Sequence, residues 1–329
     1  MKAYQVTRYG KNEKLHLSDI SKPVIKENEV LVEIHAAGVN LIDAKIRNGE
    51  FKMLIPLKPP FTIGHDVAGV VTQIGAKVSK FKIGDEVFAS SRGTFAEFIA
   101  LDESHLAFKP KNSTMEEAAS IPLVSLTAWQ VLVEKGNLKK GQKVFIQAGS
   151  GGVGTIAIQL AKHLGAYVAT TTSSTNSALV KSLGADHIID YKTEDFETIL
   201  KDYDLVLNSQ DAKTLEKSLK VLKPGGKAIS ISGPPDVDFA TETGLNWLLK
   251  TLTRLLSFKI KKIAKRLHVH YSFHFMRPEG KQLSEITALI EAGIIRPIVD
   301  KVYSFNETNE AIAYVESGRA KGKVVVKVK

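Results

Sequence analysis

The stretch that decides the fold is residues 143–154, which read KVFIQAGSGGVG. Its first part is a short apolar run typical of a buried β-strand, and its second part has the glycine spacing GxGxxG. The residues behind it have a helical period, and Gly165 follows as a C-terminal cap. The apolar face of that helix consists of Val153, Ile156, Ala157, Leu160, Ala161 and Leu164.

A glycine-rich turn between a strand and an amphipathic helix predicts a dinucleotide-binding loop. Glycines allow a tight turn and close backbone approach, while the N–H groups at the positive end of the helix receive a pyrophosphate. Three glycines at this spacing also occur in ordinary structural turns, so the flanking strand and helix give the motif its meaning.

The pattern continues outward from this loop. Apolar runs alternate with helical patterns, which is typical of a parallel sheet covered by helices on both faces. The predicted strands are residues 143–147, 166–171, 187–190, 203–208, 227–232 and 271–276. Six such strands predict a complete α/β doubly wound, Rossmann-type sheet.

The first 122 residues have a different pattern. Alternating pieces at residues 30–34 and 86–88, many glycines and no helix-strand rhythm predict a twisted, mostly antiparallel β domain. After Arg277 we expect a helix at 281–292, a strand at 298–304, a helix at 307–317 and a strand at 323–327. Periodicity alone leaves open whether this tail rejoins the N-terminal domain.

Composition narrows the class of protein. A chain of 329 residues, 43% hydrophobic, is long enough for two domains. No apolar run approaches the ~20 residues of a membrane span and the start lacks a signal sequence, so we expect a cytoplasmic protein. The absence of cysteine excludes disulfides and thiolate zinc sites. The net charge of +10 admits nucleic acid, an anionic membrane or an anionic small molecule as partner.

The end of the second predicted strand bears on the choice of cofactor. Residues 170–176 read TTTSSTN, and no acid follows before Asp186. A carboxylate here would bind an unphosphorylated ribose, whereas hydroxyls and amides can donate to a 2′-phosphate. The segment therefore favours NADPH, with Thr172, Ser173 and Ser174 as contacts. The alternative is a polar loop that caps the next helix, and the same residues could do both.

Motifs along nearly the whole chain carry a family resemblance. They are AAGVNLID (36–43), RNG (47–49), GHDVAGVV (64–71), FKIGDEV (81–87), LTAW (126–129), the glycine loop with QLAK (159–162), LGAD (183–186) and GRAKGKVV (318–325). With them the chain resembles the medium-chain dehydrogenase/reductase superfamily, in its zinc-independent quinone oxidoreductase (zeta-crystallin-like) branch. The resemblance implies a GroES-like catalytic domain (1–122 plus 278–329) and an inserted Rossmann NADPH-binding domain (123–277). It also implies a cofactor in the cleft between them and a homodimer extended through the strand at 271–276.

The zinc alcohol dehydrogenases are the alternative within this superfamily. They use Cys, His and Cys or Asp as ligands, and the matching positions here are Asn40, His65 and Leu123. A lone histidine without thiolates does not build a three-ligand zinc site, so we predict no metal. His65 is then a hydrogen-bonded cleft residue and Asp66 a turn residue.

The candidate site residues follow from the loop and the resemblance together. The cofactor contacts are Asn40, Thr127, Gly149, Ser150, Gly151, Gly152, Val153, Gly154, Thr172, Ser173, Ser174, Tyr191, Ser209, Ser232, Gly233 and Arg319. Ser177 stands where the family has a phosphate-binding lysine, and Lys181 is a weaker substitute. Asn40 and Asp43 are the catalytic candidates, for orientation rather than acid-base work. Alternatively, Asn40 ends a strand and Asp43 caps the next helix.

The chemistry expected without a Lewis acid is hydride transfer to an electrophilic carbon, in a quinone or an α,β-unsaturated carbonyl compound. The alternative is a non-catalytic NADPH-binding sensor or a nucleic-acid-binding protein of the same fold. Our guesses at a substrate lining, each of which could equally be core, are Phe51, Met53, Leu54, Ile55 and Phe275.

One segment is unusually basic. Residues 243–278 contain no acid, and one or two basic amphipathic helices are expected there. The cations that these helices would carry are Lys250, Arg254, Lys259, Lys261, Lys262, Lys265 and Arg266. The segment could pack its apolar face on the Rossmann domain or a dimer partner, or bind an anionic membrane through Lys250 to Arg266. Nucleic acid is disfavoured, because no stacking surface or groove-reading motif accompanies the charge.

Overall fold

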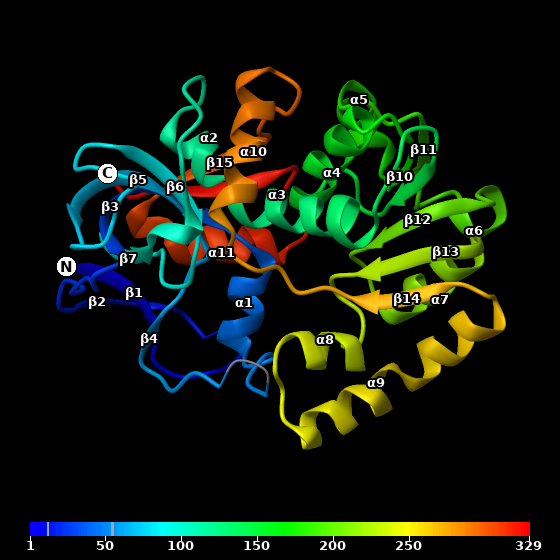
Figure 1. Ribbon diagram of the computed structural model, residues 1–329, viewed down its shortest axis with the longest axis horizontal. Helices are drawn as coiled ribbons and strands as arrows, with labels where there is room; N and C mark the ends of the chain where they lie inside the picture. The colour runs from blue at the N-terminus through cyan, green and yellow to red at the C-terminus, as the bar shows by residue number, and fades with distance from the viewer. Residues whose placement is uncertain (12, 54–55) are drawn as a thin grey trace. The chain divides into compact units, whose positions relative to one another are not determined.

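The computed structural model describes residues 1–11, 13–53 and 56–329, and it divides the chain into two compact units (Figure 1). One unit comprises residues 1–126 with 278–329, and the other comprises residues 127–277. The division falls inside one helix, α3 (Pro122–Trp129).

The second unit is built on a six-stranded parallel sheet in the order β11-β10-β9-β12-β13-β14. The strands are β9 (Lys143–Ile146), β10 (Tyr167–Thr172), β11 (His187–Asp190), β12 (Tyr203–Asn208), β13 (Leu222–Ser230) and β14 (His270–Phe273). The chain leaves β9 in both directions, so the strand order reverses between β9 and β12, as in a Rossmann fold. The predicted doubly wound sheet is confirmed.

One strand begins earlier than its pattern predicts. β13 starts at Leu222 instead of residue 227, because its pairing with β12 shifts register between Tyr203 and Leu205. The Pro224-Gly225-Gly226 sequence reads locally as a turn, but the irregular pairing keeps it within the strand.

Helices cover this sheet. They are α4 (Gly152–His163), α5 (Ser177–Ser182), α6 (Phe196–Ile199), α7 (Ala212–Lys220), α8 (Val237–Glu242) and α9 (Trp247–Arg266), with a π-helix (Gln130–Lys135) after α3 and a 3₁₀ helix (Ser174–Asn176) before α5. The core of one sheet face joins Phe145 and Ala228 to Leu215 of α7 and Ile260 of α9. The basic segment therefore forms one helix that is anchored on this sheet.

The first unit is mostly antiparallel. Its main sheet has the order β15-β16-β3-β5-β6-β8, with β7 also paired to β3, and a smaller sheet has the order β2-β1-β4. The strands are β1 (Lys2–Val6), β2 (His16–Asp19), β3 (Glu29–Val39), β4 (Phe61–Thr62), β5 (Asp66–Ile74), β6 (Glu86–Ser90), β7 (Phe98–Asp102), β8 (Leu106–Phe108), β15 (Val299–Ser304) and β16 (Lys323–Lys327).

The C-terminal tail completes this unit. β16 pairs antiparallel with β3, with Val324 opposite Val39, and β15 adds to β16 in parallel. The tail thus rejoins the N-terminal domain, and the GroES-like fold is confirmed. The helices of this unit are α1 (Leu41–Asn48), α2 (Met115–Ala119), α10 (Gly280–Glu291) and α11 (Thr308–Glu316), with 3₁₀ helices at Glu103–His105 and Phe305–Glu307.

Over residues 1–11, 13–53 and 56–329, no helix combines the length and the apolar character needed to cross a bilayer.

Candidate active site

The glycine-rich loop of the second unit has the geometry that its sequence predicts. It leaves β9 after Ile146 and enters α4 at Gly152, with Gly151 as the N-cap residue. The Gly149 N–H donates to the Thr171 carbonyl at 2.9 Å, and the Gly151 N–H donates to Ala148 at 2.9 Å. Residues 152–154 form the first turn of α4, where N–H groups have no intrahelical acceptor and can receive an anion.

The glycines of the loop serve two different purposes. A Cβ at Gly149 would lie 2.2 Å from Thr170 Oγ1, and one at Gly154 would lie 2.3 Å from the Ala148 carbonyl oxygen. Both glycines are therefore required by the packing of strand against helix. A Cβ at Gly151 would meet only the Ala148 oxygen, at 3.2 Å. The space beside Gly151 is therefore less filled than that beside Gly149 or Gly154, as close approach of a pyrophosphate requires.

A cluster of hydroxyl and amide groups adjoins the loop. Ser150 Oγ accepts from Thr172 Oγ1 at 3.0 Å and from Asn176 Nδ2 at 3.2 Å. Asn176 Oδ1 is buried and has no partner among the described residues. Ser173 Oγ lies 2.8 Å from Thr175 Oγ1. Small donors and acceptors thus gather where β10 ends, and their chemistry fits the ribose and phosphate of a nucleotide.

An acidic residue that the sequence did not indicate lies beside this cluster. β10 and β11 pair with Thr172 opposite Asp190. Asp190 Oδ2 accepts from the Ser174 N–H at 3.0 Å, and Oδ1 accepts from the Lys192 N–H at 3.0 Å. The backbone hydrogen bond from Lys192, together with that from Ser174, lowers the pKa of the Asp190 carboxyl. A carboxylate therefore stands next to one of the predicted phosphate contacts.

The ends of the central strands are tied by buried side chains. Asn208 Nδ2 donates to Gln147 Oε1 at 2.6 Å, and the Gly233 N–H donates to Ser230 Oγ at 2.7 Å. This network positions the segments after β12 and β13, which carry Ser209, Ser232 and Gly233. They lie at the carboxyl edge of the sheet, where strand order reverses and where ligands of doubly wound sheets bind.

The other predicted cofactor contacts are more scattered. Tyr191 follows β11 with its side chain 61% exposed, and its N–H donates to Thr172. Thr127 is buried in α3, and Val153 is in the first turn of α4. Arg319 is exposed and belongs to the first unit. Their contacts with a cofactor stay predictions.

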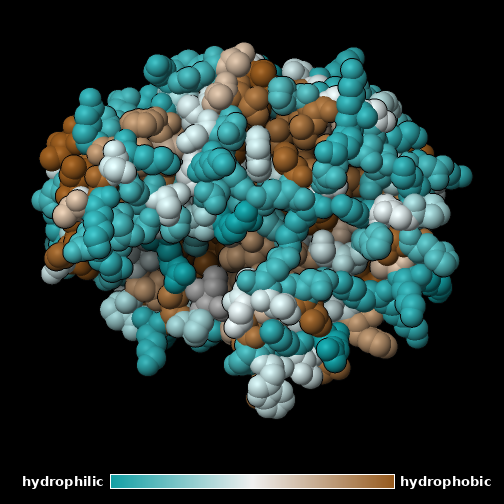
Figure 2. All heavy atoms as spheres, in the orientation of Figure 1, coloured by the Kyte–Doolittle hydropathy of each residue, from teal (hydrophilic) through white to brown (hydrophobic). Residues whose placement is uncertain are grey.

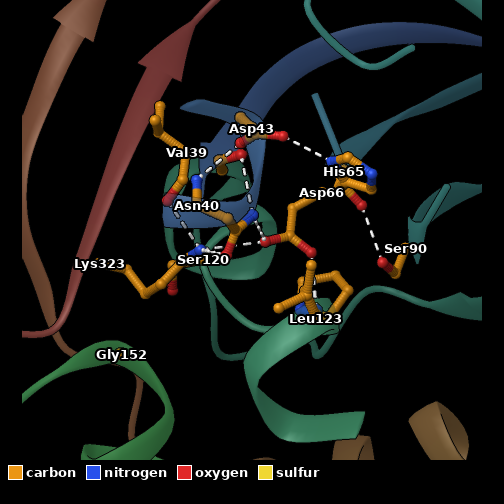
Figure 3. Close-up of polar contacts among 12 residues, drawn as sticks. Val39, Asn40, Asp43, His65, Asp66, Ser90, Ser120, Leu123, Gly152 and Lys323 are labelled. Carbon is orange, nitrogen blue, oxygen red and sulfur yellow. Dashed lines mark hydrogen bonds and ion pairs between the residues drawn. The ribbon is translucent and has the colours of Figure 1, made fainter. Parts of the chain in front are cut away.

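The first unit contains a buried polar network centred on Asp66 (Figure 3). Asp66 Oδ2 accepts from Asn40 Nδ2 at 2.8 Å and from Lys323 Nζ at 3.1 Å, while Oδ1 accepts from the Leu123 N–H at 2.7 Å. Complete burial raises the pKa of the Asp66 carboxyl, and the Lys323 ammonium acts in the opposite direction. Asp66 was expected in a turn, but it is the first residue of β5. Its carboxylate can be buried there because the Lys323 cation lies beside it.

Asn40 sits in the middle of this network. Its Oδ1 accepts from Lys323 Nζ, and its Nδ2 donates to Asp66. Both ends of the amide are thus engaged within the protein, and the side chain is buried. The predicted contact of Asn40 with a cofactor stays a prediction, whereas its role in orienting neighbouring groups follows from these bonds.

Asp43 joins the helix cap to a histidine. Its Oδ2 accepts from the Asn40 N–H at 2.8 Å, which caps α1, and its Oδ1 lies 2.5 Å from His65 Nδ1. Because a carboxylate only accepts, Nδ1 carries the proton. The Asp43 side chain is fully buried and that of His65 is 13% exposed. His65 Nε2 has no hydrogen-bond partner among the described residues, and the His65 side chain is not fully buried, so Nε2 is the available end of the pair.

Sequence reasoning missed Lys323 and Asp66 as site residues. The available signal was a lysine directly before the apolar run Val324–Val326 of an interior strand, since a cation there needs a buried partner. Within the part of the chain that the structure describes, no three His, Cys, Asp or Glu side chains gather in a way that could hold a metal ion.

The residues guessed as a substrate lining are spread over both units. Phe51 packs against the core of the first unit, Met53 is exposed, and Phe275 lies 6.4 Å from the Phe239 ring in the second unit. Leu54 and Ile55 lie outside the described residues.

Comparisons with known proteins agree with this architecture. One family model, described as an alcohol dehydrogenase GroES-like domain, matches residues 26–111, and another, described as a zinc-binding dehydrogenase, matches residues 183–326. The mitochondrial NAD(P)H oxidoreductase RTN4IP1 of Danio rerio is 36% identical over 357 residues, which cover 100% of this chain and 91% of the relative.

Two further similarities bear on the branch. The 2-methylene-furan-3-one reductase of Solanum lycopersicum is 36% identical, with 99% of this chain and 79% of the relative covered. The quinone oxidoreductase of Escherichia coli, solved in complex with NADPH, has a TM-score of 0.84 at 25% identity, and the match covers 100% of both chains. The fold, the motifs and these matches show that the chain belongs to the medium-chain dehydrogenase/reductase superfamily, in its zinc-independent quinone oxidoreductase branch, among the NAD(P)H oxidoreductases.

Proposed function

We propose that this protein is an NADPH-dependent reductase of quinones or α,β-unsaturated carbonyl compounds. The observation that carries the proposal is the Gly149–Gly154 loop, which opens α4 next to the hydroxyl and amide cluster around Ser150. The names of two similar proteins support the substrate class, since one is an enone reductase and the other a quinone oxidoreductase.

The residues of the second unit fit the cofactor. The unfilled space beside Gly151 gives room for a pyrophosphate. The N–H groups in the first turn of α4 are donors, and Asn176 Oδ1, which has no partner among the described residues, is an acceptor. When bound, a reduced nicotinamide supplies a hydride. The first turn of α4 would hold the pyrophosphate, and Thr172 and Ser173 would face the adenosine ribose and its phosphate.

The first unit fits the proton transfer that must accompany hydride addition. Addition of hydride to the β-carbon of an enone leaves an enolate, which takes up one proton at the α-carbon or oxygen. In our proposal the His65 imidazolium donates that proton from Nε2, and Asp43 holds the ring in place through Nδ1. Solvent then reprotonates the imidazole.

The proposed reaction is tested by following NADPH oxidation with a panel of quinones and enones. We expect turnover with at least one class and, for an enone in D₂O, one deuterium at the α-carbon. Cofactor binding without turnover of either class would contradict the proposal and indicate a non-catalytic NADPH-binding protein.

The two roles of the loop glycines can be separated by two substitutions. Gly151→Ala should lower the melting temperature less than Gly154→Ala but weaken NADPH binding about tenfold, because its methyl group meets one backbone oxygen at 3.2 Å and otherwise projects into unfilled space. Gly154→Ala should lower the melting temperature more, because its methyl group meets backbone more closely. Calorimetric melting and titration with NADPH measure both. Equal losses of stability in the two variants would contradict this assignment.

Asp190 provides a test of cofactor selectivity. Its carboxylate accepts from the Ser174 N–H and would repel a 2′-phosphate placed at that residue. Asp190→Asn keeps an acceptor oxygen and removes the charge. We expect about tenfold tighter NADPH binding with little change for NADH, as measured by titration calorimetry. An equal change for both cofactors would mean that no phosphate binds there.

Two other expectations belong to this proposal. The first is a homodimer whose sheet extends through β14. Strand β14 lies at the edge of the six-stranded sheet, so one of its sides has no partner strand in that sheet. Light scattering would measure the mass in solution.

A cytoplasmic location is likewise proposed, although the Danio rerio relative is named as mitochondrial.

A further inference from the structure

Helix α9 exposes large apolar side chains, although half of the residues that it buries are polar. The residues that α9 buries are Thr253, Ser257, Ile260 and Ala264. Five large apolar side chains in its N-terminal part are exposed to solvent instead. Their exposed fractions are 74% for Trp247, 61% for Leu248, 68% for Leu255, 52% for Leu256 and 63% for Phe258.

These exposed residues form a stripe at helical spacing. Leu248, Leu255 and Phe258 lie at i, i+7 and i+10, opposite the buried positions. Figure 2 shows apolar and hydrophilic side chains next to each other on the surface around α9. Scattered apolar residues are ordinary on a surface, whereas several large ones on one helix face favour an interaction surface.

The charges of α9 divide into two groups. Lys259 pairs with Glu216, and Lys261 pairs with Asp236 and Asp238, so these lysines attach the helix to its own unit. The remaining cations have no ion pair among the described residues, and four of them are exposed. They are Lys250, Arg254, Lys262, Lys265 and Arg266. Three of these five cations, Lys262, Lys265 and Arg266, lie in the C-terminal half of the same helix.

We propose that α9 binds the surface of an anionic lipid bilayer, lying in the plane of the membrane. The apolar stripe would enter the boundary between headgroups and acyl chains, and Lys262, Lys265 and Arg266 would contact anionic headgroups. A second copy fits less well, since a two-fold contact would place the unpaired cations of one copy against either the apolar stripe or the cations of the other. A nucleic acid would leave the apolar stripe exposed to water.

Sedimentation of the full-length protein with vesicles tests this surface. At about 0.15 M salt, we expect pelleting with phosphatidylcholine vesicles that contain phosphatidylserine and much less with phosphatidylcholine alone. A triple variant, Lys262→Gln with Lys265→Gln and Arg266→Gln, should bind about 100-fold more weakly, at about fivefold per cation. Leu255→Gln with Phe258→Gln should weaken binding at least about tenfold.

Two control variants remove three positive charges or two exposed apolar side chains from the first unit instead of from α9. Lys14→Gln with Lys58→Gln and Lys80→Gln changes three exposed lysines of the first unit, and Val24→Gln with Ile83→Gln changes two exposed apolar residues. Both controls should pellet much like the unchanged protein. Equal losses in the controls, or no pelleting of the unchanged protein with anionic vesicles, would overturn the proposal.

The fluorescence of Trp247 gives an independent readout. The chain has two tryptophans, and Trp247 is the highly exposed one, so its emission should shift to the blue on vesicle binding. Trp247→Phe should abolish the shift while the protein still pellets. A shift that persists in Trp247→Phe would overturn insertion through α9. Binding to duplex DNA but not to vesicles would do the same, as would a dimer that Leu255→Gln with Phe258→Gln converts to monomer.

Discussion

Replacing His65 with asparagine should lower kcat for an enone substrate by about 100-fold or more, the usual contribution of a positioned proton donor. The asparagine amide can still donate to Asp43 Oδ1 from near the position of Nδ1, but the titratable Nε2 is lost. NADPH affinity and melting temperature should therefore stay close to those of the unchanged protein. Steady-state kinetics, titration and calorimetry measure the three quantities.

Asp43→Asn is the companion variant, because it keeps an oxygen for the Asn40 N–H and removes the negative charge beside the imidazole. kcat for an enone substrate should fall, because an amide oxygen is a weaker acceptor than a carboxylate for the Nδ1–H that orients the imidazole. A purely structural role of Asp43 would leave kcat unchanged. Full kcat in His65→Asn would show that the proton comes from solvent and would remove this pair from the reaction.

Lys323→Met should destabilise the first unit by about 3–5 kcal/mol, because it leaves the buried Asp66 carboxylate without a countercharge. Asn40 Oδ1 and the Val39 carbonyl would lose the same donor. For a unit of this size, the melting temperature should fall by roughly 10 °C. Calorimetry is the suitable measurement, since both tryptophans, Trp129 and Trp247, lie in the other unit.

The control for this substitution lies on the same strand. Lys327 pairs with Glu116 at 3.3 Å, but its side chain is 57% exposed, so Lys327→Met should cost less than about 1 kcal/mol. Adding Asp66→Asn to Lys323→Met should restore part of the lost stability, because no unpaired charge is then buried. If the two lysine variants melt at the same temperature, the buried network does not hold the first unit together.

Much of the fold could be predicted from local pattern. The strands of the second unit, the helix behind the glycine loop and the tail elements at 281–327 are recognisable because periodicity and glycine spacing depend on near neighbours. β13 was predicted too short, since the Pro-Gly-Gly sequence at its start resembles a turn and only pairing with β12 keeps it extended. Pairing of β16 with β3 was likewise not readable from periodicity, because the two strands are far apart in the sequence.

The candidate site divides in the same way. The sequence by itself determined the loop from Gly149 to Gly154, the hydroxyl-rich end of β10 and the absence of cysteine, which are properties of single segments or of composition. Only the tertiary structure decided that Asp190 meets Ser174, that Lys323 neutralises Asp66 across 257 residues of chain, and that α9 turns its apolar stripe to solvent. The physical reason is that burial and charge pairing are set by which elements pack together, and one-dimensional spacing does not contain that information.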